Sequence, residues 1–206
     1  MRVNVDSLTN FTIEVQQSAV GTRAGKQEFY QDHSSSWNSC LVVNAKKRQQ
    51  TIIEREGCHY LIDVLCMNDV VGRAQVVKLD VEGADVDILL NMDPSRWKTV
   101  ELLLCEYSIA RELQEGKRRQ PVENDGVPLL WAVDRFEQVL KALSTAGFEN
   151  VLLPSEIFKP DRWTAKHMRA GYDFVFLASK RKDERGDNFS RWKSFRQIFD
   201  GGIRPA

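Results

Sequence analysis

The stretch from Val76 to Asp85 (VVKLDVEGAD) constrains the fold of this 206-residue chain more than any other. A short, nearly continuous aliphatic run is typical of a strand that is covered on both faces. The run ends at Asp80 and Glu82, Gly83 permits a tight turn, and residues 84–92 continue with apolar side chains at helical spacing. Because open parallel sheets bind ligands beyond the carboxyl ends of their strands, we predict that Asp80 and Glu82 face a functional site.

The other segments outline an alternation of strands and helices. Residues 11–20 alternate between apolar and polar side chains and predict a half-buried strand that ends at Gly21. Residues 60–65 form either another strand or the start of a short helix. Further strands are expected at 27–30, 100–106, 151–153 and 172–178, with a helix over 129–146 that stops at Gly147. This alternation favours an α/β fold with a mostly parallel sheet.

The composition is that of an ordinary globular protein, with 42% hydrophobic and 28% charged residues. The formal net charge is zero, so we expect no nucleic acid partner. The four cysteines form no C-x-x-C pair and are expected to be reduced, packed thiols. The sequence contains neither a signal peptide nor an apolar run of membrane-spanning length, which predicts a cytoplasmic protein without a membrane span.

Taken in order, these features resemble the FkbM family of S-adenosylmethionine-dependent methyltransferases. The family hallmark is an apolar strand running into Asp-x-Glu-Gly-x-Glu and a helix, and Asp85 stands here at the last position as a shortened carboxylate. The match also includes residues 19–21 closing a strand, the serines 34–36 in the following loop, and a second buried strand ending in Glu106. The resemblance implies a Rossmann-like class I methyltransferase fold over residues 1–180.

The same resemblance implies methyl transfer from S-adenosylmethionine to a hydroxyl of a small molecule or glycan. Its catalytic residues would be Asp80, Glu82 and Glu106, and its substrate-binding residues Ser35 and Ser36. His33, beside Asp32 in the same loop, is a further substrate-binding candidate as a general base near an acceptor. Two carboxylates at neighbouring strand ends could converge on an acceptor hydroxyl, or on a divalent cation such as Mg²⁺. Acids after a strand can instead cap the following helix, and His33 can equally be a solvent-exposed residue. No zinc-type spacing is present, and no metal ligand is predicted.

One departure from the family concerns the cofactor. A methyltransferase of this class opens with a strand and a glycine-rich turn that holds the cofactor, but the glycines before the hallmark form no such cluster. The front of the cofactor domain is therefore expected to be missing, and no cofactor-binding residue is predicted. In the class I strand order the missing first strand lies beside residues 76–80, so the sequence predicts an exposed edge there. Residues 11–20, a second copy or another protein would cover that edge.

The tail from residue 181 to 206 differs in character from the rest. After a charged link, Phe189, Trp192, Phe195 and Phe199 recur every three or four residues, with basic side chains between them. This pattern predicts an amphipathic aromatic helix that either docks on its own domain or binds a protein partner or a membrane. An alternative function follows: an inactive, methyltransferase-like binding module, or a fragment of a longer enzyme.

Overall fold

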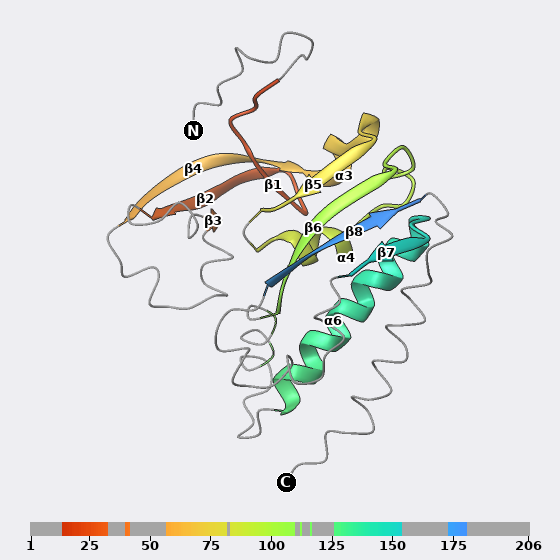
Figure 1. The fold of residues 1–206 in the computed structure, drawn as a ribbon. Coiled ribbons are helices and arrows are strands. Elements are labelled where there is room, and N and C mark those ends of the chain that lie inside the picture. The colour runs from red at the N-terminus through yellow and green to blue at the C-terminus, as the bar shows by residue number, and fades with distance from the viewer. Residues whose placement is uncertain are drawn as a thin grey trace, which may run out of the picture.

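Two four-stranded sheets make up most of the part of the chain that the structure describes (Figure 1). The structure is a computed structural model. It describes residues 14–32, 40–41, 57–81, 83–109, 112, 116, 126–153 and 173–180. Within these ranges there are three α-helices, and only two of them lie between strands of the second sheet.

The first sheet contains β1 (Ala19–Gly21), β2 (Gly25–Asp32), β3 (Cys40–Leu41) and β4 (Gly57–Cys66), in the order β1-β4-β2-β3. β1 lies parallel to β4, whereas β2 is antiparallel to both β3 and β4. The turn before β2 uses Gly25 at φ 146°, a conformation that favours glycine. β4 settles the alternatives left open for residues 60–65, which lie in the middle of a ten-residue strand.

The second sheet contains β5 (Val76–Leu79), β6 (Leu102–Ser108), β7 (Asn150–Leu152) and β8 (Asp173–Ser179), in the order β5-β6-β8-β7. β5 and β6 are parallel, and β8 is antiparallel to both of its neighbours. β5 is therefore an outer strand, and among the described residues its other edge pairs with nothing.

The hydrophobic core lies between one face of the second sheet and two helices, α4 (Asp85–Leu90) and α6 (Gly126–Thr145). α3 (Met67–Val70) and the 3-10 turn η2 (Val71–Arg73) connect β4 to this sheet and add Met67 and Val71 to the core. Aromatic rings from β6, β8 and α6 pack against one another at its centre in four pairs, three of them edge to face, with centroids 4.7–5.7 Å apart: Tyr107, Phe136, Phe174 and Phe176.

The long helix was predicted well. Val133, Phe136, Leu140 and Leu143 are all buried on one face of α6, as their spacing indicated. Gly147, at φ 86°, ends the helix, where its N–H donates to the Ser144 carbonyl and the Phe148 N–H donates to the Leu143 carbonyl. This pair of hydrogen bonds is the Schellman arrangement, which needs a left-handed residue and therefore favours glycine.

The predicted mostly parallel, Rossmann-like sheet is wrong. The described strands form two separate mixed sheets, and four of their six pairings are antiparallel. In the second sheet β8 inserts antiparallel between β6 and β7, so that only β5 and β6, joined through α4, remain as a parallel pair. The strand predicted over 11–20 is also shorter than expected: within the described residues it covers only Ala19–Gly21, and it pairs with β4 rather than with β5.

None of the helices in the described ranges combines the length and the apolar character needed to cross a membrane.

Candidate functional site

The acidic turn after β5 is organised around the carboxylate of Asp85. One of its oxygens accepts a hydrogen bond from the Val81 N–H at 3.0 Å, and the other accepts one from the Gly83 N–H at 3.1 Å. The Asp85 side chain is buried, and Gly83 has a φ of 112°, so the chain doubles back over this carboxylate. The last acid of the hallmark therefore has a structural role, and it fixes the direction in which the chain leaves β5.

Asp80 and Glu106 are brought together by the pairing of β5 with β6. The last paired positions are Leu79 and Cys105, and Asp80 and Glu106 each follow directly. Neighbouring strands lie about 4.8 Å apart, and side chains two residues apart share a face. Asp80 thus lies on the same face as Lys78, whose Nζ is 2.9 Å from Asp80 Oδ2. The register places Asp80 and Glu106 side by side, although β6 continues beyond Glu106 to Ser108, and their convergence on one acceptor or cation stays a prediction.

The charges of this cluster act on one another. The hydrogen bond and ion pair that Lys78 makes with Asp80 raise the pKa of the Lys78 ammonium, and the charge of Glu106 adds to the increase. Beneath the cluster, burial raises the pKa of the Cys105 thiol well above its usual value, helped by the charges of Asp85, Glu106 and Asp80. Cys105 is therefore a neutral thiol, because a thiolate there would be both desolvated and close to three carboxylates.

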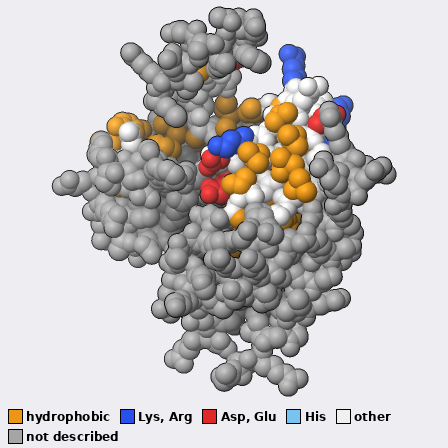
Figure 2. Space-filling model, viewed as in Figure 1, with side chains coloured by type: hydrophobic (Ala, Val, Ile, Leu, Met, Phe, Trp, Pro, Cys, Tyr) orange, Lys and Arg blue, Asp and Glu red, His pale blue; other side chains and the backbone are white. Residues whose placement is uncertain are grey.

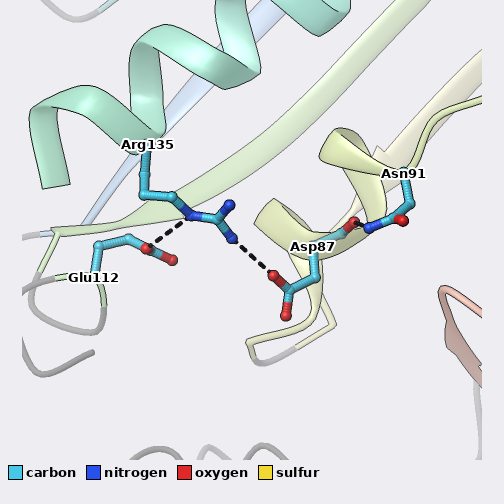
Figure 3. A network of polar contacts seen from close by, with 4 residues as sticks. All are labelled: Asp87, Asn91, Glu112 and Arg135. Atoms are coloured by element: carbon cyan, nitrogen blue, oxygen red, sulfur yellow. Dashed lines mark hydrogen bonds and ion pairs between the residues drawn. The ribbon is translucent and has the colours of Figure 1, made fainter. Parts of the chain in front are cut away.

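A second polar network ties the helices of the core together on the other face of the sheet (Figure 3). The guanidinium of Arg135 in α6 lies between two carboxylates, with Nη2 at 2.8 Å from Asp87 of α4 and Nε at 3.5 Å from Glu112. Glu112 is 4% exposed, and the nearby guanidinium offsets part of the cost of burying its carboxylate. Asn91 in turn donates to the Asp87 backbone carbonyl. The network fixes α4, which begins at Asp85, against α6.

Four of the predicted site residues lie outside the described residues. Glu82 falls in a one-residue gap between residues 81 and 83, and His33, Ser35 and Ser36 belong to residues 33–39. Their catalytic and substrate-binding roles stay predictions from the sequence. Among the residues that the structure does describe, no group of three or more His, Cys, Asp or Glu side chains is arranged to hold a metal ion.

The described residues do not fit S-adenosylmethionine by themselves. The resemblance places the cofactor's strand and glycine-rich turn beside β5, but the outer edge of β5 pairs with no described strand. The nearest candidate, β1 with its terminal Gly21, belongs to the other sheet and lies against β4. We therefore assign no cofactor-binding residue.

Sequence reasoning missed Lys78 and the network around Arg135. Lys78 could have been found, since a lysine two residues before Asp80 on a strand must share its face. The ion pairs of Arg135 join residues 23 and 48 positions apart, to Glu112 and Asp87. Only the packing of α6 on α4 brings Arg135 close to these carboxylates, and no local sequence pattern predicts that packing.

No protein-family model matches this chain, and neither the curated proteins nor the solved structures contain a match to it. The resemblance to the FkbM family stays a prediction from the sequence.

We expect Asp85→Asn to destabilise the fold by about 1–3 kcal/mol. An amide supplies one carbonyl oxygen for two backbone donors, and its NH₂ group would meet an N–H that needs an acceptor. Urea unfolding monitored by circular dichroism measures the change. Asp69→Asn is the matched control, because Asp69 is also a first-turn acid of a short helix but is exposed. Equal stability of both variants would show that the buried carboxylate does not hold the turn.

We also expect Asp80→Asn to lower the pKa of Lys78 more than Glu106→Gln does, because Asp80 contributes the hydrogen bond and the larger charge effect. The folded pKa of Lys78 is raised, so its favourable ion pair is present at neutral pH and is lost as pH rises through that pKa. NMR titration of ¹³C-methylated lysines measures this value. Asp63→Asn, which removes the partner of Lys26 in the first sheet, should leave Lys78 unchanged. If the pKa of Lys78 is the same in Asp80→Asn, Glu106→Gln and the wild type, the three charges do not form an interacting cluster.

Proposed function

We propose that this chain acts in the transfer of a methyl group from S-adenosylmethionine to a hydroxyl of a small molecule or glycan in the cytoplasm. One observation supports the proposal: Asp80, which directly follows β5, stands next to Glu106 of β6, the strand with which β5 pairs in parallel. The resemblance of the surrounding sequence to the FkbM family supports the choice of reaction.

The two carboxylates, Asp80 and Glu106, activate the hydroxyl that accepts the methyl group. A hydroxyl is a poor nucleophile until a base takes its proton, and a positioned carboxylate contributes roughly 10²–10⁴-fold to such a step. Asp80 and Glu106 are close enough in register for one hydroxyl to contact both, so one carboxylate can orient it while the other accepts the proton. Lys78, paired with Asp80 at 2.9 Å, fixes the position of that side chain.

The methyl donor supplies an electrophilic methyl group when it is bound. Because the described residues do not fit this cofactor by themselves, we assign the chain only the acceptor's half of the reaction. We expect weak binding of S-adenosylhomocysteine, with a dissociation constant above the low micromolar range.

The free edge of β5 favours a second candidate, a methyltransferase-like module that binds a partner without catalysis. Four residues of an apolar strand, Val76–Leu79, offer backbone groups on this edge that no described strand uses. Proteins normally cover or charge such edges, since they are templates for pairing with another chain. In this reading Asp80 and Glu106 are charges that flank a binding edge.

Radiolabelled methyl transfer tests the proposal. The chain is incubated with millimolar tritiated S-adenosylmethionine and a panel of hydroxyl acceptors that includes sugars, glycans and phenols. We expect slow transfer to at least one acceptor class, because the millimolar donor concentration compensates for weak binding, and a loss of about 100-fold or more in Asp80→Asn and in Glu106→Gln. Asp63→Asn is the matched control, since Asp63 is also paired with a lysine on its sheet but lies in the first sheet.

Two results separate the candidates. If both site variants transfer the methyl group at the wild-type rate, the two carboxylates have no catalytic role. Complete absence of transfer, together with no heat of binding for S-adenosylhomocysteine in calorimetry, would leave the partner-binding module as the function.

A further inference from the structure

Glu106 presents its carboxylate on a face of the second sheet rather than at the end of a strand. β6 continues beyond Glu106 to Ser108, so the Glu106 side chain projects from the middle of a paired strand. Asp80 lies on the same face as Lys78, two residues before it, and its carboxylate pairs with the Lys78 ammonium. A molecule whose hydroxyl contacts both carboxylates therefore lies over this face of the sheet.

The side chains beside Glu106, toward the middle of this face, are aliphatic. Val175 of β8 stands directly opposite Glu106, and Leu104 precedes Glu106 by two residues on β6. The register continues the row of Leu104 through Leu177 of β8 to Leu152 of β7. We call these four aliphatic residues the aliphatic platform. Figure 2 shows hydrophobic side chains gathered on this face, with acidic and basic side chains at one side.

The aliphatic platform is accessible from solvent. Val175 is 50% exposed and Leu152 is 49% exposed, whereas Leu104 and Leu177 are partly exposed. Exposed apolar side chains that adjoin one another and are bordered by charged groups normally mark a surface that binds something apolar. The aromatic helix predicted at residues 189–199 lies outside the described residues and stays a prediction from the sequence.

We propose that the acceptor of this chain is an apolar alcohol or phenol, whose hydrocarbon body lies on the aliphatic platform while its hydroxyl contacts Asp80 and Glu106. This assignment rests on the proposed function, because the acceptor belongs to the same site. In the reaction the hydroxyl gives its proton to one of the two carboxylates and its oxygen bonds to the methyl group. The electron pair of the broken carbon–sulfur bond stays on the sulfur of the donor.

The dimensions of the aliphatic platform suit a molecule of two fused rings. From Glu106 on β6 to Leu152 on β7 there are two strand steps, which together span about 10 Å. A flat aromatic body of this length covers the side chains of both rows, and its burial is favourable in proportion to the apolar area removed from water. Its hydroxyl then projects beyond Val175 toward the two carboxylates.

A sugar fits this face poorly. It carries hydroxyls around its whole ring, and those above the aliphatic platform would lose water without gaining a hydrogen-bond partner, which costs free energy. A sugar ring can stack on aromatic side chains, but the aromatic residues of β6 and β8 are buried in the core: Tyr107, Phe174 and Phe176. The observed surroundings of Glu106 therefore favour the apolar acceptor over a glycan.

Binding of three small probes to the full-length chain tests the proposal. 2-Naphthol has a hydroxyl on an apolar body, 2-methoxynaphthalene keeps this body but cannot donate a hydrogen bond, and methyl β-glucoside is a sugar with many hydroxyls. The NMR signal of ¹³C-methylated Lys78 reports binding, because this side chain pairs with Asp80. We expect 2-naphthol to bind about tenfold or more tightly than either of the other probes, since only its hydroxyl reaches a carboxylate from an apolar body.

Substitutions in the aliphatic platform locate the bound probe. Val175→Ser and Leu177→Ser should each weaken the binding of 2-naphthol by about fivefold, because each removes apolar surface beneath the rings. Val175 is half exposed, so Val175→Ser keeps the fold and remains informative if Leu177→Ser unfolds. Leu61→Ser is the matched control and should leave binding unchanged, since Leu61 is an aliphatic residue of the first sheet that is 68% exposed.

Equal affinity for 2-naphthol and 2-methoxynaphthalene would overturn the proposal, as would binding of 2-naphthol that Val175→Ser leaves unchanged. Methyl transfer to a sugar, without binding of 2-naphthol, would overturn it while leaving the proposed reaction intact. Binding of 2-naphthol that depends on the aliphatic platform, without any methyl transfer, would support the acceptor site and contradict the proposed reaction. The two claims can therefore fail separately.

Discussion

The parallel pairing of β5 with β6 is the interaction on which the rest of this structure depends. Its register, from Val76 opposite Leu102 to Leu79 opposite Cys105, puts Asp80 beside Glu106. The same alternation sends Val77 and Leu79 into the core and Lys78 to the opposite face. A slip of one residue would exchange these two faces and bury the lysine. The acid pair and the core are thus two results of one register.

The turn after β5 fixes the direction in which the chain leaves this strand. The buried carboxylate of Asp85 accepts two backbone N–H groups that the reversal of the chain would otherwise leave without acceptors. α4 starts at Asp85 and is fixed to α6 through Asp87 and Arg135. A catalytic or binding carboxylate needs rigid support of this kind, because a small displacement of the side chain strongly reduces its contribution to catalysis or binding.

Much of the local structure could be predicted from the sequence. The α6 face and its glycine stop follow from helical spacing, and β5 and its acidic turn follow from an aliphatic run that ends in carboxylates. The sheet topology could not be predicted, because strand direction depends on which strands become neighbours. β8 lies between β6 and β7 although it is the last of the described strands. The placement of Asp80 beside Glu106 was predicted only through the resemblance, and the ion pairs of Arg135 gave no local signal.

Residue-resolved amide exchange on β5 tests this account most directly. The Gln75 carbonyl accepts the Leu102 N–H. In a parallel strand the N–H and C=O of one residue point the same way, so the amides of Val77 and Leu79 face β6, and those of Val76 and Lys78 face the free edge. In a dilute monomer the account predicts slow exchange at Val77 and Leu79 and fast exchange at Val76 and Lys78. Equal protection of all four amides would show that another strand occupies this edge, and would contradict the sheet order and the site built on it.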